Sequence, residues 1–349
     1  MLMNFDIGNR EVGIGKPCYI IAEVSCNHHQ KLQNALRLIE EAKAAGADAV
    51  KFQTYTPDTM TLDVKNEYFQ IKGTLWKGQT LHDLYKKAYT PWEWFPELSD
   101  RAKSEGIQFF SSPFDLSAVD LLEKLDVPAY KIASFEINHI PLIQKVASLK
   151  KPIIFSTGVA DKSDIELALK TISDSSNDKV ILMKCTSAYP APLCEMNLKM
   201  IPYLSSTFGV PVGLSDHSMD PNMAVAAVSL GAVAIEKHFI YSRKEGGPDA
   251  EFSLEPKELK ALVKSVRDTE EALGEVTYNI GEKVREHRFL MRSIFVSKNI
   301  KKGEKFTSSN ISIVRPSNGL APVNYPKVLG KIATKDLLAG TPLTWEMVQ

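Results

Sequence analysis

Nearly continuous apolar runs alternate with amphipathic stretches over most of the chain. Strands buried on both faces of a parallel sheet show such continuous runs, whereas half-exposed strands alternate apolar and polar residues. Eight runs fit the buried pattern, and they span residues 18–25, 49–55, 107–114, 129–134, 152–157, 180–187, 210–216 and 233–239. We therefore predict eight buried parallel strands.

The stretches between these runs have the apolar spacing of helices. In residues 32–46, Leu32, Leu36 and Ile39 share one stripe, and Gly46 ends the pattern. A longer helix is expected to end at Gly274. Strands alternating with helices indicate an α/β protein with a (β/α)8 TIM barrel. A doubly wound open sheet is the alternative, but no glycine-rich nucleotide fingerprint follows the first strand.

Two segments interrupt the regular alternation. Residues 56–90 form a long insertion after the second strand, and long loops in compact domains are usually lids or binding loops. After about residue 280 the pattern becomes strand- and turn-like, with Lys-Gly and Asn-Gly turn signals. We predict a catalytic barrel over 1–280, followed over 281–349 by a linker and a small β-rich domain.

Composition narrows the class of protein. The chain has 42 Lys and Arg against 42 Asp and Glu, so no overall positive field attracts nucleic acid or an anionic membrane. The N-terminus has no signal-peptide pattern, and no apolar run reaches the ~18 residues of a membrane helix. Four cysteines without a CxxC pair suggest reduced thiols. We expect a cytoplasmic protein that binds neither nucleic acid nor membrane.

Charged residues lie inside three of the apolar runs. Lys51, Lys131 and Glu23 would be buried there, and a buried charge is costly without a partner. The two lysines, with several serines at the strand ends, would form a cradle for a phosphate group. Glu23 is a candidate for proton transfer, or for a structural ion pair with a strand lysine.

Two histidines end adjacent strands. His217 follows the seventh run and His238 lies in the eighth, so barrel closure places both at one mouth. Neutral imidazoles suit a divalent transition metal, and Asp216 and Glu236 are candidates to orient the rings. A histidine with a purely structural role is the alternative. Two protein ligands would leave positions for water and substrate.

These motifs resemble the sialic acid synthase family. The resemblance rests on IIAEVSCNH, GADAVKFQTY, SSPFD, YKIASFE, PIIFSTG, CTSAYPAP, GLSDH and EKHF in the barrel. The segments IKKGE, VRPSNGL and GKIATKDLLAGTPL are similar to that family's C-terminal antifreeze-like (SAF) domain. The resemblance covers nearly the whole chain.

The resemblance implies a role for each candidate residue. Phosphoenolpyruvate would be bound by Lys51, Ser112, Lys131, Ser134, Ser156, Ser187 and Ser215. The sugar would contact Glu23, Gln53, Glu136, Tyr189, Asp249 and Arg315. His217 and His238 would hold a divalent ion, Mn²⁺, Mg²⁺ or Co²⁺. Glu23, Lys51 and Lys131 are the catalytic candidates. Arg315 would reach the partner's barrel, which implies a homodimer with domain-swapped SAF tails.

The insertion resembles that of one subgroup, the pseudaminic acid synthases. KCTSAYP also differs from the HCTNxYP type of N-acetylneuraminate synthases, because Lys184 and Ser187 replace His and Asn. The sugar implied is 2,4-diacetamido-2,4,6-trideoxy-β-L-altropyranose, which is comparatively apolar. The aromatic side chains of Trp76, Tyr85, Trp92 and Trp94 would suit such a sugar. The alternative for Trp92 and Trp94 is that they pack a helix start.

The reaction implied is a metal-dependent, aldol-like condensation of phosphoenolpyruvate with the amino sugar, with C–O cleavage releasing phosphate. Neuraminate and legionaminate synthases remain alternatives. A Schiff-base pyruvate aldolase would use Lys131 or Lys184 to form an imine. A non-catalytic saccharide- or ice-binding protein is a further alternative, but it has no need of buried Lys, Glu and His at strand ends.

Overall fold

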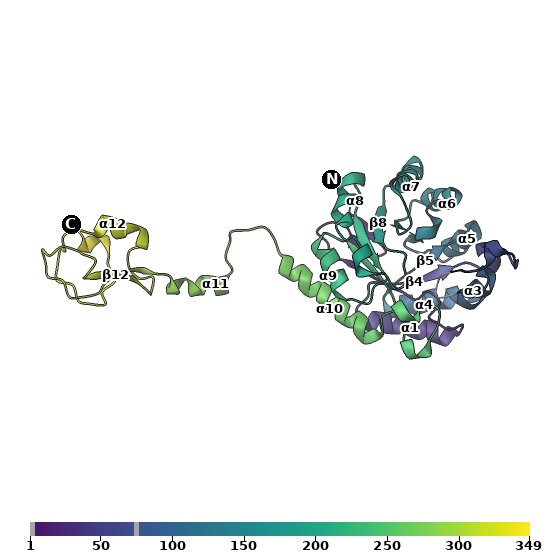
Figure 1. The fold of residues 1–349 in the computed structure, drawn as a ribbon, viewed down its shortest axis with the longest axis horizontal. Coiled ribbons are helices and arrows are strands. Elements are labelled where there is room, and N and C mark those ends of the chain that lie inside the picture. Colours follow the sequence, from purple (N-terminus) through teal and green to yellow (C-terminus); the bar gives the residue numbers. More distant parts are fainter. Residues whose placement is uncertain (1–3, 73–76) are drawn as a thin grey trace. The chain divides into compact units, whose positions relative to one another are not determined.

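The computed structural model describes residues 4–72 and 77–349, and the chain divides into two compact units, Met1–Gly274 and Glu275–Gln349 (Figure 1). Each unit has its own cluster of buried apolar side chains. No described helix is long and apolar enough to cross a lipid bilayer.

Eight parallel strands of the first unit close into a barrel in the order β10-β3-β4-β5-β6-β7-β8-β9. The strands are β3 (Tyr19–Glu23), β4 (Ala49–Thr54), β5 (Gln108–Pro113), β6 (Tyr130–Ile132), β7 (Ile153–Ser156), β8 (Val180–Cys185), β9 (Val212–Asp216) and β10 (Ala234–His238). Each lies within one of the eight apolar runs. The closed barrel confirms the predicted fold class and excludes the open sheet.

Helices surround the barrel, as Figure 1 shows. They are α1 (Leu32–Ala45), α4 (Phe95–Glu105), α5 (Leu116–Lys124), α6 (Ile140–Ser148), α7 (Lys162–Asp174), α8 (Met200–Phe208), α9 (Asn222–Ser229) and α10 (Pro256–Leu273). Helix α1 buries Leu36 and Ile39 of the predicted stripe and ends at Gly46, whose φ of 92° is open to glycine at low cost. Helix α10 ends before Gly274, as predicted.

The described part of the insertion after β4 contains three short helices. They are α2 (Pro57–Met60), η1 (Glu67–Phe69) and α3 (Leu81–Ala88), and η2 (Trp92–Trp94) follows the insertion. The side chain of Thr80 caps α3 by accepting a hydrogen bond from the backbone N–H of Asp83 at 3.0 Å. His82 Nε2 lies 3.0 Å from Asp58 Oδ1, which connects α3 to α2. These contacts fix a helical wall beside the barrel mouth.

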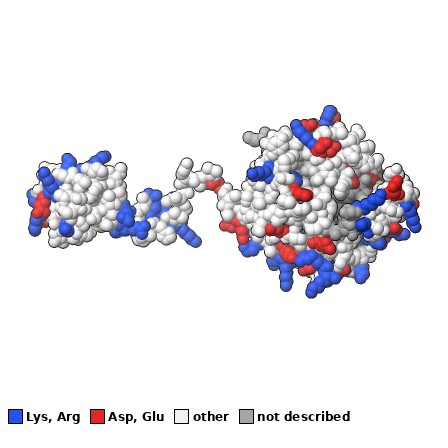
Figure 2. All heavy atoms as spheres, in the orientation of Figure 1, with Lys and Arg blue, Asp and Glu red and all other residues white. Residues whose placement is uncertain are grey.

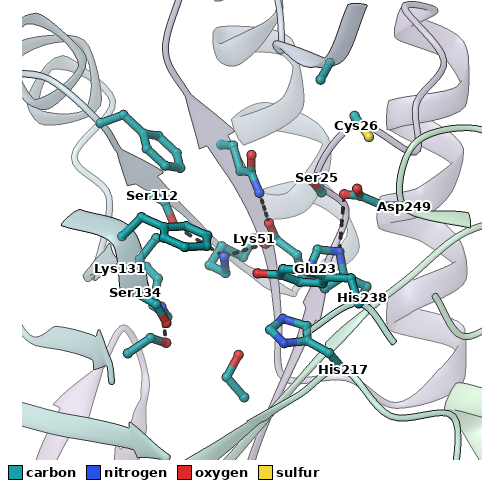
Figure 3. Close-up of a pocket in the computed structure, with 18 of the residues that line it drawn as sticks. Glu23, Ser25, Cys26, Lys51, Ser112, Lys131, Ser134, His217, His238 and Asp249 are labelled. Carbon is teal, nitrogen blue, oxygen red and sulfur yellow. Dashed lines mark hydrogen bonds and ion pairs between the residues drawn. The ribbon is translucent and has the colours of Figure 1, made fainter. Parts of the chain in front are cut away.

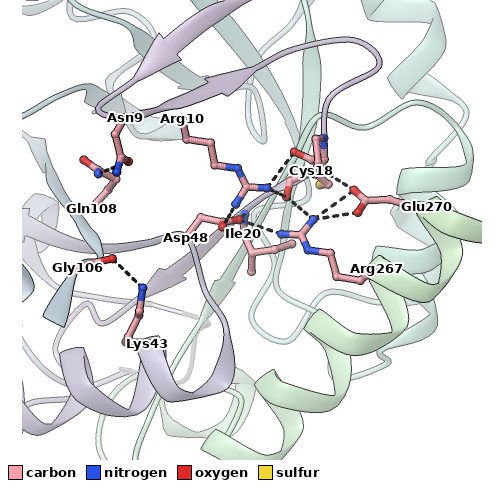
Figure 4. Close-up of polar contacts among 11 residues, drawn as sticks. Asn9, Arg10, Cys18, Ile20, Lys43, Asp48, Gly106, Gln108, Arg267 and Glu270 are labelled. Carbon is pink, nitrogen blue, oxygen red and sulfur yellow. Dashed lines mark hydrogen bonds and ion pairs between the residues drawn. The ribbon is translucent and has the colours of Figure 1, made fainter.

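A hairpin of β1 (Phe5–Ile7) and β2 (Arg10–Val12) precedes the barrel and contacts the starts of its strands. Arg10 pairs with Asp48, just before β4, and Arg267 of α10 lies 3.1 Å from the same carboxylate (Figure 4). Asp48 also accepts the backbone N–H of Ile20 at 2.8 Å. This ionic cluster closes the end of the barrel opposite the polar strand ends.

The second unit is small and rich in β-bridges. Strands β11 (Ser293–Val296) and β12 (Ile311–Val314) pair antiparallel, and α11 (Glu282–Glu286), η7 (His287–Leu290) and α12 (Tyr325–Val328) accompany them. Its core comprises Ile294, Val296, Ile300, Phe306, Ile311, Val328, Ala333, Leu337 and Leu343. These nine side chains give the tail an apolar core separate from that of the barrel.

Candidate active site

A cavity of about 220 Å³ opens at the C-terminal ends of the barrel strands. Figure 3 shows side chains from several strands and loops converging on it. The sequence candidates that line it are Glu23, Lys51, Gln53, Ser112, Lys131, Ser134, Ser156, Tyr189, Ser215, His217, His238 and Asp249. Ser187 and Glu136 do not line it, and Arg315 belongs to the second unit.

Lys131 lies at the base of this cavity and is 2% exposed. Its Nζ donates to Ser156 Oγ at 2.6 Å and to the carbonyl of Ile132 at 2.9 Å. Within the described part of the chain it forms no ion pair with a carboxylate. Burial lowers the pKa of Lys131 because the ammonium loses water. The charge of Glu236 opposes this shift without forming an ion pair with Lys131, so a bound anion would supply a direct partner.

Lys51 differs from Lys131 because carboxylates of the protein balance its positive charge. Its Nζ lies 2.6 Å from Glu23 Oε2 and 3.7 Å from Glu236 Oε2, and it donates to Ser112 Oγ at 3.3 Å. Burial opposes the charged ammonium, but the two carboxylates raise the pKa of Lys51. Lys51 therefore stays charged at the cavity wall.

Glu23 ends β3, the strand that lies between β10 and β4 in the barrel. It is paired with Lys51 on β4 and with His238 on β10, so three functional groups meet on neighbouring strands. Gln53 Nε2 donates to Glu23 Oε1 at 2.9 Å. Burial raises the pKa of Glu23, against the opposing attraction of Lys51. The ion pair weighed as a structural alternative is present, and the same carboxyl also lines the cavity.

Hydroxyl groups complete the polar base, and a glycine allows them to approach. The backbone N–H of Gly158 donates to Ser134 Oγ at 3.1 Å. A Cβ at Gly158 would collide with Ser187 Oγ and lie 2.9 Å from Ser134 Oγ. Ser187 Oγ therefore lies beside Gly158, although Ser187 does not line the cavity. Gly158 is a site residue that the sequence analysis missed.

His217, directly after β9, and His238 on β10 face the same cavity (Figure 3), with ring centroids 5.3 Å apart. His217 Nδ1 lies 3.0 Å from the carbonyl of Thr186, which leaves Nε2 for another partner. The buried His238 Nδ1 has no hydrogen-bond partner and lies 3.5 Å from Asp249 Oδ2. Burial and then the charge of His217 lower the pKa of His238, which favours its neutral ring.

These two imidazoles fit a divalent metal ion. The donors are neutral or neutralisable nitrogens, and His238 Nδ1 is a buried nitrogen that lacks a partner. The described residues contain no cluster of three or more His, Cys, Asp and Glu side chains placed to hold an ion. Substrate and water would therefore supply the remaining ligands, as in catalytic rather than structural sites.

The two carboxylates expected to orient the rings lie in different places. Asp216 forms a buried ion pair with Lys237 at 3.0 Å, on the outer side of the strands. Glu236 accepts from Ser215 Oγ at 3.0 Å and faces Lys51. The expectation that Asp216 orients an imidazole was wrong, because strand alternation sends this carboxylate away from the mouth. Glu236 faces the cavity, where its charge acts on His217.

The remaining sugar candidates lie around the histidines. The Tyr189 ring is 4.5 Å from that of His217 and 5.0 Å from that of Phe252. Burial raises the pKa of Asp249 despite hydrogen bonds from Ser25 and Cys26. Glu136 is half-buried outside the cavity lining, and burial raises its pKa to about 7.

The aromatic residues of the insertion have different roles. Tyr85 lines the cavity. Trp92 and Trp94 pack against the barrel core, and Trp92 Nε1 donates to the carbonyl of Tyr55 at 3.1 Å. The helix-packing alternative is thus correct for both. Trp76 lies outside the described residues.

Cys185 was not among the sequence candidates, and Glu236 was expected only to orient an imidazole. Glu236 and Cys185 both line the cavity, and Cys185 Sγ lies 3.8 Å from His217 Nδ1. The period of two along a strand held a signal for Glu236, which shares a face with His238. Lys184, a candidate for imine formation, does not line the cavity and donates to the carbonyl of Cys185 at 2.5 Å.

Comparison with known proteins identifies relatives of the whole chain. Residues 38–278 match the NeuB family, and residues 291–349 match the SAF domain. Pseudaminic acid synthase of Campylobacter jejuni serotype O:2 is 46% identical, covering 94% of this chain and 96% of the relative. Pseudaminic acid synthase of Helicobacter pylori is 43% identical, covering 96% and 98%.

The chain is also similar to solved structures of proteins from polysaccharide and sialic acid biosynthesis. The spore coat polysaccharide biosynthesis protein SpsE of Bacillus subtilis is 36% identical with a TM-score of 0.68, covering 99% of both chains. The N-acetylneuraminic acid synthetase of Leptospira borgpetersenii is 33% identical with a TM-score of 0.74, covering 82% of this chain and 95% of the other. The chain therefore belongs to the NeuB family and carries a C-terminal SAF domain.

Proposed function

We propose that this enzyme condenses phosphoenolpyruvate with 2,4-diacetamido-2,4,6-trideoxy-β-L-altropyranose to give pseudaminic acid and phosphate. The observation that carries the proposal is Lys131, a buried ammonium at the cavity base without a carboxylate partner among the described residues. A phosphorylated carboxylic acid supplies that missing negative charge. The names of the two pseudaminic acid synthases support the choice of sugar.

The cavity base would hold phosphoenolpyruvate. Lys131 and Lys51 provide positive charge, and Ser112, Ser134, Ser156 and Ser215 provide hydroxyl donors. Fixed donors of this kind lower the barrier by positioning the substrate and by stabilising charge that develops on its oxygens. Ser187 and Gly158 would support the base.

The aldehyde of the open-chain sugar would lie beside the two histidines. A Mn²⁺, Mg²⁺ or Co²⁺ ion held by His217 and His238 would supply Lewis acidity to the carbonyl oxygen. Gln53, Tyr189 and Asp249 line this part of the cavity and would contact the sugar hydroxyls. Glu136 would contact the sugar although it does not line the cavity, through its largely buried carboxyl group.

The condensation forms one carbon–carbon bond and one carbon–oxygen bond to water, and it breaks the carbon–oxygen bond to phosphate. Carbon 3 of phosphoenolpyruvate attacks the sugar aldehyde, water adds to carbon 2, and the carbon–oxygen bond to phosphate then breaks. Glu23 is placed to accept the proton of that water, because it lies between Lys51 and His238 in register. The raised pKa of Glu23 brings it nearer to the range useful for proton transfer.

We further propose a homodimer in which the SAF tail of each copy completes the partner's barrel. The unit 1–274 carries 30 Lys and Arg against 36 Asp and Glu, whereas 275–349 carries 12 against 6. Blue side chains outnumber red ones on the face of the small unit in Figure 2. The first residues of the second unit also expose the apolar side chains of Val276, Tyr278 and Phe289. Arg315 would then contact the partner's sugar.

The described cysteines are free thiols, and Cys18, Cys26 and Cys185 are buried. Thiols without disulfides are typical of a reducing compartment. We therefore place the reaction in the cytoplasm.

A substrate panel with phosphate detection tests the proposal. The enzyme is given phosphoenolpyruvate with the altro sugar or with the precursor hexoses of neuraminate or legionaminate, with and without a chelator. Rapid phosphate release with the altro sugar, abolished by chelator, is expected. Preference for another sugar would reassign the substrate within the family. A borohydride-trapped pyruvate adduct would instead establish the Schiff-base aldolase.

A further inference from the structure

One side of the cavity is apolar and comes from the insertion. Met60 of α2 and Leu84, Tyr85 and Ala88 of α3 line it. The buried ring of Tyr55, which also lines the cavity, packs edge-on against Tyr85 at 5.6 Å. We name Met60, Leu84, Tyr85 and Ala88 the apolar wall.

The polar groups of the same cavity belong to the barrel strands. Lys51 lies within β4, Lys131 lies within β6 and His238 ends β10, whereas the apolar wall lies on helices that follow β4. The charged end of phosphoenolpyruvate and the sugar aldehyde therefore have their places at the strands. The carbon of the sugar farthest from the aldehyde is carbon 6, so an open-chain hexose with its aldehyde at the histidines would direct carbon 6 away from the strand residues.

Three members of the apolar wall cannot replace the water that a sugar hydroxyl loses. Met60, Leu84 and Ala88 have no strong hydrogen-bonding group in the side chain. A hydroxyl placed against them loses hydrogen bonds to water without compensation, whereas a methyl group gains from burial. The wall therefore has the chemistry to favour a deoxygenated carbon.

The apolar wall is held in a defined position. The His82–Asp58 contact joins α3 to α2, and Thr80 caps the first turn of α3. After α3, Thr90 Oγ1 lies 3.2 Å from the Nε2 of the buried His28. Because these contacts hold both ends of α3, the apolar wall should not move away to let water reach a substrate hydroxyl.

We infer that the apolar wall selects sugars whose carbon 6 is a methyl group and rejects those with a hydroxyl at that carbon. The inference rests on the proposed function and extends it from a family of sugars to a specific contact. It concerns residues outside the polar groups that hold phosphoenolpyruvate and the aldehyde.

Two sugars that differ in one atom test it. The proposed altro sugar is compared with the same diacetamido sugar carrying a hydroxyl at carbon 6, and kcat/KM is measured by phosphate release. Apolar pockets reject an added hydroxyl by up to about a hundredfold, so the wild type is expected to prefer the methyl sugar by about ten- to a hundredfold. In Met60→Gln and Leu84→Asn, this preference is expected to fall about tenfold.

Lys86→Gln is the matched control, because Lys86 lies on the exposed side of α3 and does not line the cavity. It should keep the wild-type preference. Met60 is half-buried, so Met60→Gln provides the test if the buried Leu84→Asn substitution unfolds the protein. Melting temperatures identify such a variant.

An unchanged preference in folded Met60→Gln would overturn the inference, as would a wild type that uses both sugars equally well. Failure of the proposed function would look different, because the wild type would then release no phosphate with either sugar. That result would remove the inference together with the function on which it rests.

Discussion

The two lysines of the cavity differ in what neutralises their charge. Lys51 lies between the carboxylates of Glu23 and Glu236, whereas Lys131 donates only to a hydroxyl and a carbonyl among the described residues. An unpaired buried charge destabilises a fold, so its removal stabilises the protein. Removal of one partner from a buried ion pair destabilises the fold, because the other charge is left buried and uncompensated. The two positions should therefore respond in opposite ways to the same substitution.

Lys131→Met removes the ammonium and keeps most of the volume. The melting temperature of the barrel is expected to rise, by the equivalent of about 1 kcal/mol or more. The concentration of phosphoenolpyruvate for half-maximal rate should rise about 10- to 100-fold, because a charged hydrogen bond to the substrate is lost. Thermal unfolding and phosphate release measure the two effects.

Lys51→Met is the matched control. It leaves Glu23 and Glu236 as neighbouring buried carboxylates, so it should destabilise the fold by about 2 kcal/mol or more. A Lys131→Met variant that is destabilised to the same extent would contradict the view that Lys131 lacks a partner in the free enzyme.

A second residue-scale prediction concerns pH. Burial raises the pKa of Glu23, and a base must be ionised to accept a proton, so kcat/KM should fall as pH drops through that raised pKa. Glu23→Gln should lower the rate about 100-fold or more and remove this acidic limb. A pH–rate profile of phosphate release measures both.

Glu136→Gln separates the two carboxyls. The pKa of Glu136 is raised to about 7 by burial, but this residue does not line the cavity. The acidic limb should therefore survive in Glu136→Gln. If the acidic limb were lost in Glu136→Gln and kept in Glu23→Gln, proton transfer would belong to Glu136 and the assignment to Glu23 would be wrong.

Residue types were predictable from the sequence, but their partners were not. A charge inside an apolar run, such as Lys51 or Glu23, already indicates a buried functional group. Its partner depends on strand register, and only barrel closure brings β10 next to β3, so that Glu236 faces Lys51. The same dependence explains why Asp216 was wrongly expected to orient a histidine.

At the scale of elements, the ionic cluster at the strand starts connects segments that are distant in the chain. Asp48 receives Arg10 of the hairpin, Arg267 of α10 and the N–H of Ile20 (Figure 4). The cluster lies at the end of the barrel opposite the active site. Its role should therefore be stability without an effect on catalysis.

Asp48→Asn tests this separation. Loss of the carboxylate charge should lower the free energy of unfolding by about 1–3 kcal/mol, because its arginine partners are only partly exposed. Asp120→Asn removes one partner of an exposed pair with Lys145 and should cost less than about 1 kcal/mol. Urea unfolding of the barrel measures both, and a reduced kcat in Asp48→Asn would contradict the separation.

The elements differ in how much the sequence disclosed. Barrel strands buried on both faces leave long apolar runs, so all eight were predicted. Strands β1 and β2 have three residues each, too few to establish a period, and they were missed. The helices α2 and α3 were missed inside an insertion expected to be a long loop, because four- and eight-residue helices carry little pattern.

At the scale of the whole molecule, zero net charge conceals opposite charges in the two units. The tail has an excess of six positive charges and the barrel an excess of six negative ones, from 12 against 6 and 30 against 36. Opposite charges favour association and are weakened by salt. Such an attraction would bring each tail to a partner's barrel in the proposed dimer.

Mixed dimers test whether the tail acts on the partner. Glu23→Gln lowers the rate of the barrel about 100-fold or more and keeps a normal tail, whereas Arg315→Ala keeps the barrel and alters the tail. Coexpression with two different tags allows the mixed dimer to be purified. If tails are exchanged, one of its two sites combines a normal barrel with a normal tail, so the mixed dimer should have about half the wild-type activity.

Each parent dimer should be nearly inactive, because both of its sites carry a defect. If each tail instead completed the barrel of its own chain, both sites of the mixed dimer would still be defective, and its activity would equal that of the parents. Recovery in the mixed dimer therefore requires a contribution in trans. If opposite charges hold the tails on the partner barrels, the recovered activity should fall as salt weakens that attraction.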